Sequence, residues 1–156
     1  MSRWVLATTA DVGMVCFAPT FNRLLEEAAM GLQDILLSDD AAKNIQAHVR
    51  QTSQWAVEAT SNREDLTLVR WLEEVLYQCE IGRRFLVDSQ IRVGEQLQAQ
   101  VSWVDADLVE REIEVKAVTR HDLDCRFVPQ GEIVDGDDGI PDFEGPGWTC
   151  RVIFDI

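Results

Sequence analysis

Two segments in the first half of the chain repeat their apolar residues with the period of an amphipathic helix. In residues 21–36 and 66–79 an apolar side chain returns every three or four positions, which gives each helix one apolar face. Thr20 can cap the first helix, residues 38–40 end it, and residues 61–65 supply a cap and early acids for the second. Because such a helix must bury its apolar face, we expect both helices to lie on a sheet.

Alternation of apolar and polar residues predicts strands in the rest of the chain. Residues 4–8 and 13–18 read as two short strands joined by a turn at 9–13, and alternation between the two helices predicts a strand within 45–59. After Gly82 we expect only strands and short turns. These strands are 85–93, 96–104, 112–120, 123–127 and 148–156.

The order of these elements predicts the α+β class. We expect a two-layer sandwich in which a mixed, mostly antiparallel sheet carries both amphipathic helices on one face. A chain of 156 residues is long enough for one domain, 1–156. Within it, residues 129–147 hold five Gly, three Pro and six acidic residues, which predicts an exposed and partly disordered acidic loop.

The charge of the chain is strongly negative, with 28 acidic residues against 14 Lys and Arg and a formal net charge of −14. Affinity for nucleic acid comes mainly from basic side chains that neutralise phosphates. We therefore expect no direct contact with RNA or DNA and none with an anionic membrane. Divalent cations or a protein partner with a basic surface would be attracted, although the acidity can equally serve only solubility.

Four cysteines and two histidines do not form a zinc motif. No cysteine is in CxxC spacing, and we expect reduced thiols that pack as small apolar side chains in a cytoplasmic protein. The first ten residues contain one Arg and no long apolar stretch, so they do not read as a signal peptide, and no apolar run is long enough for a membrane span. The cysteines are Cys16, Cys79, Cys125 and Cys150.

The carboxyl-terminal segment is a candidate metal site. Residues 151–156 are apolar at nearly every position, as in a buried strand, and they place Asp155 beside the terminal carboxylate of Ile156. Two such charges about 4 Å apart repel by roughly 4 kcal/mol at an effective dielectric of about 20, so a cation, backbone donors or water must offset them. Asp11, in a turn bounded by Gly13, can supply a third carboxylate. Ca²⁺ or Mg²⁺ suits oxygen ligands, but solvation by water explains the same residues.

No catalytic motif accompanies these carboxylates. The patterns GxSxG, GxGxxG and HExxH and the Walker loop do not occur. The acidic run at 135–139 lacks the Gly and Glu that an EF-hand requires, since Ile140 and Pro146 stand at those positions. His121 and Lys116 read as a turn residue and a sheet-surface residue. A metal-dependent hydrolase built on the carboxylates would lack a general acid or base.

Four segments, taken in order, resemble the archease family. Each segment is short, but the ordered set spans nearly the whole chain and includes a last strand that runs to the final residue. The segments are TTADVGM at 8–14, LVRWLEEVLY at 68–77, VKAVTRH at 115–121 and VIFDI at 152–156.

The resemblance implies a non-enzymatic protein cofactor with a two-layer α+β fold. It implies a Ca²⁺ site formed by Asp11, Asp155 and Ile156, and a functional role for Lys116. Archeases promote guanylylation and turnover of the RtcB-type RNA ligase, which joins tRNA exons and repaired RNA ends. We therefore expect that ligase as the partner of a monomer or weak homo-oligomer. The alternative is a chaperone-like interaction module that does not activate the ligase.

Several polar positions depart from the family pattern. Thr8 stands where the family usually has His, Arg70 where it has Asp, Glu73 where it has Asn, and Arg120 where it has Tyr. These changes concern the polar site rather than the apolar core. Arg70 could weaken a metal site, supply its cation or face solvent.

Overall fold

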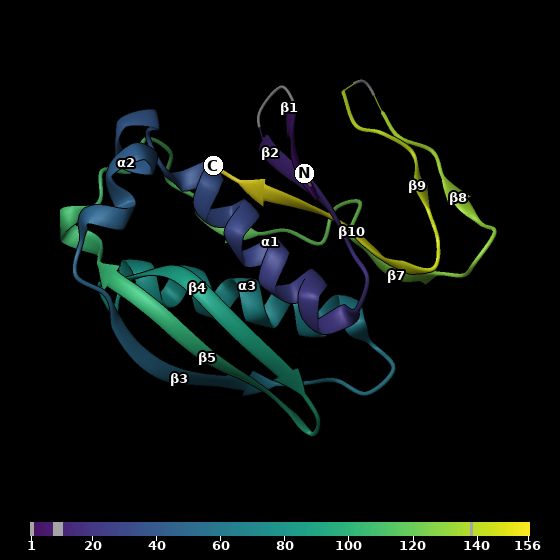
Figure 1. Cartoon of the computed structure of the whole chain (residues 1–156), viewed down its shortest axis with the longest axis horizontal. Helices are drawn as coiled ribbons and strands as arrows, with labels where there is room; N and C mark the ends of the chain where they lie inside the picture. Colours follow the sequence, from purple (N-terminus) through teal and green to yellow (C-terminus); the bar gives the residue numbers. More distant parts are fainter. Residues whose placement is uncertain (1, 8–10, 138) are drawn as a thin grey trace.

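Two long helices lie between two antiparallel sheets (Figure 1). The computed structural model describes residues 2–7, 11–137 and 139–156. Helix α1 (Phe21–Leu36) contacts β2 and β4, whereas α3 (Glu64–Glu80) contacts β4 and β7, so each helix contacts strands of both sheets. The apolar faces of both helices therefore meet in one continuous core.

The larger sheet places the last strand of the chain in its interior. Its order is β1-β2-β10-β6, with β7 also paired to β10, and every pairing is antiparallel. Because β10 has neighbours on both edges, residues from the start and the end of the chain lie side by side. The strands of this sheet are β1 (Arg3–Ala7), β2 (Asp11–Ala18), β6 (Ala117–Val118), β7 (Asp124–Val128) and β10 (Gly147–Asp155).

The smaller sheet has the order β3-β5-β4 and is covered along one edge by α1. On β4, the carbonyl of Leu86 accepts a hydrogen bond of 3.0 Å from Gln33 Nε2, and the N–H of Ile91 donates to Glu26 Oε2 at 3.4 Å. The two α1 side chains thus satisfy backbone groups that an edge strand would leave open. The strands are β3 (Gln51–Glu58), β4 (Arg84–Val93) and β5 (Gln96–Asp105).

Local side-chain bonds define where α1 begins and how the helices meet. Thr20 Oγ1 accepts a hydrogen bond from the N–H of Arg23 at 3.2 Å, which caps the first turn of α1 as predicted. The fully buried Trp71 of α3 donates from Nε1 to the carbonyl of Leu25 at 3.0 Å. This bond fixes the position of one helix against the other while it satisfies a buried donor.

The α+β class, the antiparallel strands and the two amphipathic helices are confirmed. The described strands, however, are divided between two main sheets and the separate pair β8–β9 instead of lying in one sheet. Gly31 and Gln33 are buried on α1 in addition to its apolar stripe, so this helix is covered on more than one side. A single sheet covers only one face of a helix, and the second sheet buries a further part of α1, while Arg23 and Asp34 remain exposed.

Residues 45–49 are not a strand, in contrast to the prediction. Ser38 Oγ accepts a hydrogen bond from the N–H of Ala41 at 3.1 Å and starts a short helix, α2 (Asp39–Asn44), which the 3-10 turn η1 (Ile45–Ala47) extends. A second 3-10 turn, η2 (Ala106–Leu108), follows β5. A local cap therefore overrides the alternation of apolar residues, and only the second half of 45–59 forms the predicted strand.

Two strand boundaries also differ from the prediction. Of residues 112–120, only the two residues of β6 form a strand, whereas β2 begins two residues early, at Asp11. Residues 11–13 of the predicted turn at 9–13 therefore belong to β2. Thr8, Thr9 and Ala10 lie outside the described residues.

The acidic segment 129–147 packs over the larger sheet instead of being disordered in its described part. It contains the small antiparallel pair β8 (Ile133–Val134) and β9 (Phe143–Glu144). Phe143 stacks on Phe17 of β2 with ring centroids 4.6 Å apart, and Ile140 is buried. Ile140 and Phe143, which are apolar residues within this polar, Gly-rich segment, were the sequence signal that the segment packs on the sheet.

Candidate functional site

The first residue of β2 and the last residue of β10 are direct cross-strand partners. The antiparallel register of the two strands pairs Asp11 with Asp155, next to the pair formed by Val12 and Phe154. Asp11 is half-buried and Asp155 is exposed. The structure therefore brings together the two acidic side chains that the sequence proposed from opposite ends of the chain.

Backbone hydrogen bonds on the edge of β10 that faces β6 show whether Asp11 and Asp155 are a hydrogen-bonded or a non-hydrogen-bonded pair. The carbonyl of Asp155 accepts from the N–H of Lys116 at 2.7 Å, and the carbonyl of Ile153 accepts from the N–H of Thr119 at 2.9 Å. Since these carbonyls point away from β2, Asp11 and Asp155 form a non-hydrogen-bonded pair, in which the Cα atoms lie about 4.5 Å apart. Both side chains then project from the same face of the sheet at close range.

Like charges placed directly opposite on neighbouring strands destabilise a sheet. Ile156 follows Asp155 directly and is itself 39% exposed. Among the described residues no group of three His, Cys, Asp or Glu side chains is placed to hold a metal ion. A third oxygen ligand would therefore come from a group such as the main-chain carboxylate.

These groups fit a hard divalent cation in their chemistry. Carboxylate oxygens are the ligands that Ca²⁺ and Mg²⁺ prefer, and a soft metal would require sulfur or imidazole. Asp11, Asp155 and the carboxylate of Ile156 would hold the ion, with remaining positions open to water or to a partner. The sheet register supplies the close approach of the two side chains that such a site needs.

The backbone of Lys116 lies beside this site, because its N–H is hydrogen-bonded to the carbonyl of Asp155. Lys116 also lines a groove between α3 and the segment before β6. The groove has a volume of about 590 Å³, and its other polar side chains include Glu73, Tyr77 and Arg120. Tyr77 is 56% exposed. Two of the positions that depart from the family pattern, Glu73 and Arg120, thus line the same groove as Lys116.

Arg70 is engaged elsewhere. Its guanidinium donates to Thr60 Oγ1 at 2.6 Å and forms a longer ion pair with Glu58 at 3.8 Å. These partners lie at the end of β3 and in the turn that follows it. Of the three possibilities that the sequence left open for Arg70, a surface contact is the one that the structure shows. Thr8 lies outside the described residues.

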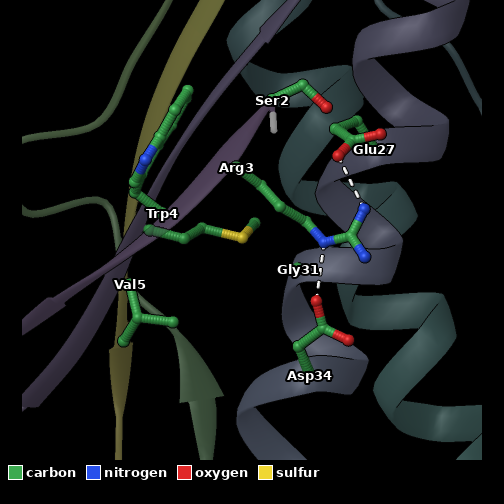
Figure 2. A pocket seen from close by; sticks show the side chains of 8 residues that line it. Ser2, Arg3, Trp4, Val5, Glu27, Gly31 and Asp34 are labelled. Carbon is green, nitrogen blue, oxygen red and sulfur yellow. Dashed lines mark hydrogen bonds and ion pairs between the residues drawn. The ribbon is translucent and has the colours of Figure 1, made fainter. Parts of the chain in front are cut away.

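A second cluster of charged residues was missed by sequence reasoning. Figure 2 shows a cavity of about 530 Å³ between β1 and α1, where Arg3 extends between Glu27 and Asp34. The guanidinium lies 2.6 Å from Glu27 Oε1 and 2.6 Å from Asp34 Oδ2. Burial opposes the charge of Arg3, but its hydrogen bonds to Asp34 and Glu27 raise the pKa overall. These residues are far apart in sequence and share no motif.

Close packing of α1 on β2 forms the floor of this cavity. A Cβ added to Gly31 would lie 2.8 Å from Met14 Sδ, so only glycine allows this approach without displacing the methionine. Gly13 has a comparable role on the other face of the sheet, where an added Cβ would lie 2.6 Å from Ile153 Cδ1 and 3.2 Å from Leu6 Cδ1. The glycine of the predicted site motif is therefore required by strand packing.

The two-sheet α+β fold and the acidic pair at the end of its central strand define the class: a small acidic protein with a candidate site for a divalent cation. No helix in the described residues is long and apolar enough to cross a membrane. The model of the archease protein family (MTH1598/TM1083) matches residues 4–156. The chain belongs to the archease family.

Two individual proteins illustrate this relationship. The chain is 28% identical over 139 residues to the protein archease of Thermococcus gammatolerans, covering 84% of this chain and 93% of that protein. The solution structure of Methanobacterium thermoautotrophicum protein 1598 is similar with a TM-score of 0.58 and 20% identity, over 99% of both chains. The second comparison concerns the fold alone, and it confirms the predicted fold class.

Proposed function

We propose that this protein is a non-enzymatic cofactor that activates an RtcB-type RNA ligase by promoting guanylylation and turnover of the ligase. Membership of the archease family supports a protein cofactor. The observation that carries the proposal is the pairing of Asp11 with Asp155, since it assembles the acidic site from the two family motifs that lie farthest apart in the sequence.

The acidic pair would act as a cation-dependent contact surface. Asp11, Asp155 and the carboxylate of Ile156 would hold Ca²⁺ or Mg²⁺, which would offset their repulsion and order this end of the sheet. The pair lies at the ends of its two strands, where Asp155 and Ile156 are exposed. Its position allows a partner to reach the same oxygen atoms.

Lys116 would contribute a positive charge next to this surface. Its backbone N–H is fixed by the bond to the Asp155 carbonyl, while its exposed side chain lies in the groove with Glu73 and Arg120. The ammonium group is therefore positioned by the same strand that positions Asp155. We propose that it contacts the ligase and does not contact RNA, because a net charge of −14 favours a basic protein surface over phosphate.

A guanylylation assay tests this function directly. Purified ligase is incubated with GTP and Ca²⁺ or Mg²⁺, with and without an equimolar amount of the protein, and covalent ligase–GMP is quantified over time. We expect stimulation by the wild-type protein and a loss of at least about tenfold in Asp11→Asn and Asp155→Asn, comparable with removal of a catalytic electrostatic contact.

The matched control is Asp107→Asn. Asp107 is an exposed acid in η2 that pairs with Arg83 at 3.2 Å, far along the chain from either site residue. It changes the net charge by the same amount and should retain full stimulation. Full stimulation by both site variants, with folding verified by circular dichroism, would reject the site assignment.

A second candidate function is a chaperone-like interaction module that binds its partner without activating it. The observation that favours it is the change of polar residues in the Lys116 groove, together with the engagement of Arg70 by Thr60 and Glu58. Calorimetric titration of the ligase with the protein separates the two functions. Binding without any stimulation of guanylylation supports the module, whereas binding with stimulation supports the cofactor.

A further inference from the structure

Three of the four cysteines form a row across neighbouring strands of the larger sheet. The register pairs Cys150 of β10 with Cys16 of β2 on one side and with Cys125 of β7 on the other. Residues directly opposite on adjacent strands project from the same face. The three thiols therefore lie in line on the inner face of the sheet, although nothing in their sequence spacing indicated it.

The two pairs in this row differ in geometry. Carbonyls of odd-numbered β10 residues point to the β6 and β7 side, as the bonds from Lys116 and Thr119 show, so the backbone of Cys150 faces β2. Cys150 and Cys16 are then a hydrogen-bonded pair with Cα atoms about 5.5 Å apart, and Cys150 and Cys125 a non-hydrogen-bonded pair at about 4.5 Å. Both separations lie in the range that a disulfide spans. The Cys150 thiol is hydrogen-bonded with that of Cys16, so a Cys125–Cys150 disulfide would replace this contact.

Access from solvent also differs along the row. Cys16 and Cys150 are 0% and 1% exposed, whereas Cys125 is half-buried. Cys125 is thus the thiol that an external reagent meets first, with Cys150 directly behind it. A metal site is not the better reading, because no three described His, Cys, Asp or Glu side chains are placed to hold an ion.

We propose that Cys125 and Cys150 form a reversible cross-strand disulfide, with a low-molecular-weight disulfide such as glutathione disulfide as the oxidant. The Cys125 thiolate attacks one sulfur of the oxidant, forms a mixed disulfide and releases one thiolate. The Cys150 thiolate then attacks Cys125 Sγ and displaces the second thiolate. Two protein thiols are oxidised by two electrons, one oxidant disulfide is reduced, and the two protons pass to the released thiolates.

This bond would close the base of the acidic segment 129–147. β7 leads into the segment and β10 leads out of it (Figure 1), and the proposed disulfide joins the two strands there. Burial raises the pKa of the Cys125 thiol, and the hydrogen bond with Cys16 together with burial raises the pKa of the Cys150 thiol. The reaction is therefore expected to take hours. Cross-linking a loop of this length restricts the unfolded chain and should raise the melting temperature of the oxidised form by roughly 5 °C.

The test uses the full chain in glutathione disulfide or in reduced glutathione. After alkylation of free thiols, intact mass spectrometry counts the thiols protected by a disulfide, and peptide mapping identifies the linked pair. We expect two protected thiols in the wild-type protein, linked as Cys125–Cys150. The cross-link and the oxidant-dependent rise in melting temperature should both be absent from Cys125→Ser, whose half-buried position tolerates serine.

Two matched variants make the outcome decisive. Cys79→Ser removes a buried cysteine outside the row, and Cys16→Ala removes the third thiol of the row; both should retain the Cys125–Cys150 link. The proposal is overturned if the wild-type protein forms no intramolecular disulfide, if the link joins Cys16 to Cys150, or if Cys125→Ser keeps the oxidant-dependent shift.

Discussion

Two pairs of acidic side chains, one on α1 and one across β2 and β10, are brought together in different ways. Glu27 and Asp34 share the guanidinium of Arg3, with both contacts at 2.6 Å. Asp11 and Asp155 are instead held opposite each other by strand register, and Asp155 forms no ion pair with any described residue. The first pair has a cation that belongs to the chain. The second lies at the ends of two paired strands, where Asp155 is exposed and an external cation can reach both carboxylates.

The largest expected difference between the two pairs is their response to Ca²⁺. A ligand that binds only the folded state at 100 times its Kd stabilises the protein by about 2.7 kcal/mol. We expect such a gain for the wild-type protein and for Arg3→Gln, but not for Asp155→Asn. Urea unfolding with Ca²⁺ or with a chelator measures it. An equal gain in Asp155→Asn would show that the ion binds elsewhere.

Removal of the Arg3 guanidinium should have the next largest effect on the free energy of unfolding. Arg3→Gln removes the charge shared by Glu27, whose side chain is only 16% exposed, and by the half-exposed Asp34. We expect a loss of about 1–2 kcal/mol in the free energy of unfolding without divalent ions, because charged hydrogen bonds are broken and an acid is left partly buried. Arg23→Gln is the control, since its pair with Glu26 is largely exposed on the arginine side. Equal losses in both variants would contradict a special role for Arg3.

Removing one charge from the Asp11 and Asp155 pair should have a smaller effect of opposite sign. In a chelator, Asp155→Asn relieves the repulsion between directly opposed carboxylates, and we expect a gain of about 0.5 kcal/mol in stability. Urea unfolding at low salt measures the gain, which should shrink as salt screens the charges. A loss of stability at low salt would mean that Asp155 is already neutralised within the chain.

The smallest expected change in stability is that of Lys116→Met. The side chain is exposed and only the backbone of Lys116 is bonded to Asp155, so the free energy of unfolding should stay within about 0.5 kcal/mol of the wild-type value. The Ca²⁺-dependent gain should also persist, because the lysine is not a ligand. If ligase stimulation falls while both properties remain, Lys116 acts on the partner. A lost Ca²⁺ response would instead place it in the ion site.

The periodic elements of this fold could be predicted because their signals are local. Both long helices and the β4–β5 hairpin follow apolar periodicity, which reports the side of an element that will be buried. Alternation of apolar residues wrongly predicted a strand at 45–49, because a hydrogen bond from the Ala41 N–H to the Ser38 hydroxyl starts a short helix just before these residues. The docking of Ile140 and Phe143 was also missed, because the Gly and acidic residues around them dominate the composition of the loop.

The sequence by itself determined the α+β class, the positions of the long helices and, through family motifs, which acidic residues and which lysine to examine. Only the tertiary structure decided that Asp11 lies opposite Asp155, that Arg3 joins Glu27 to Asp34, and that Cys125, Cys150 and Cys16 form a row. The physical reason is register. A strand's own residues specify which faces it can bury, but its partner and its alignment are set by the packing of the whole sheet on the helices.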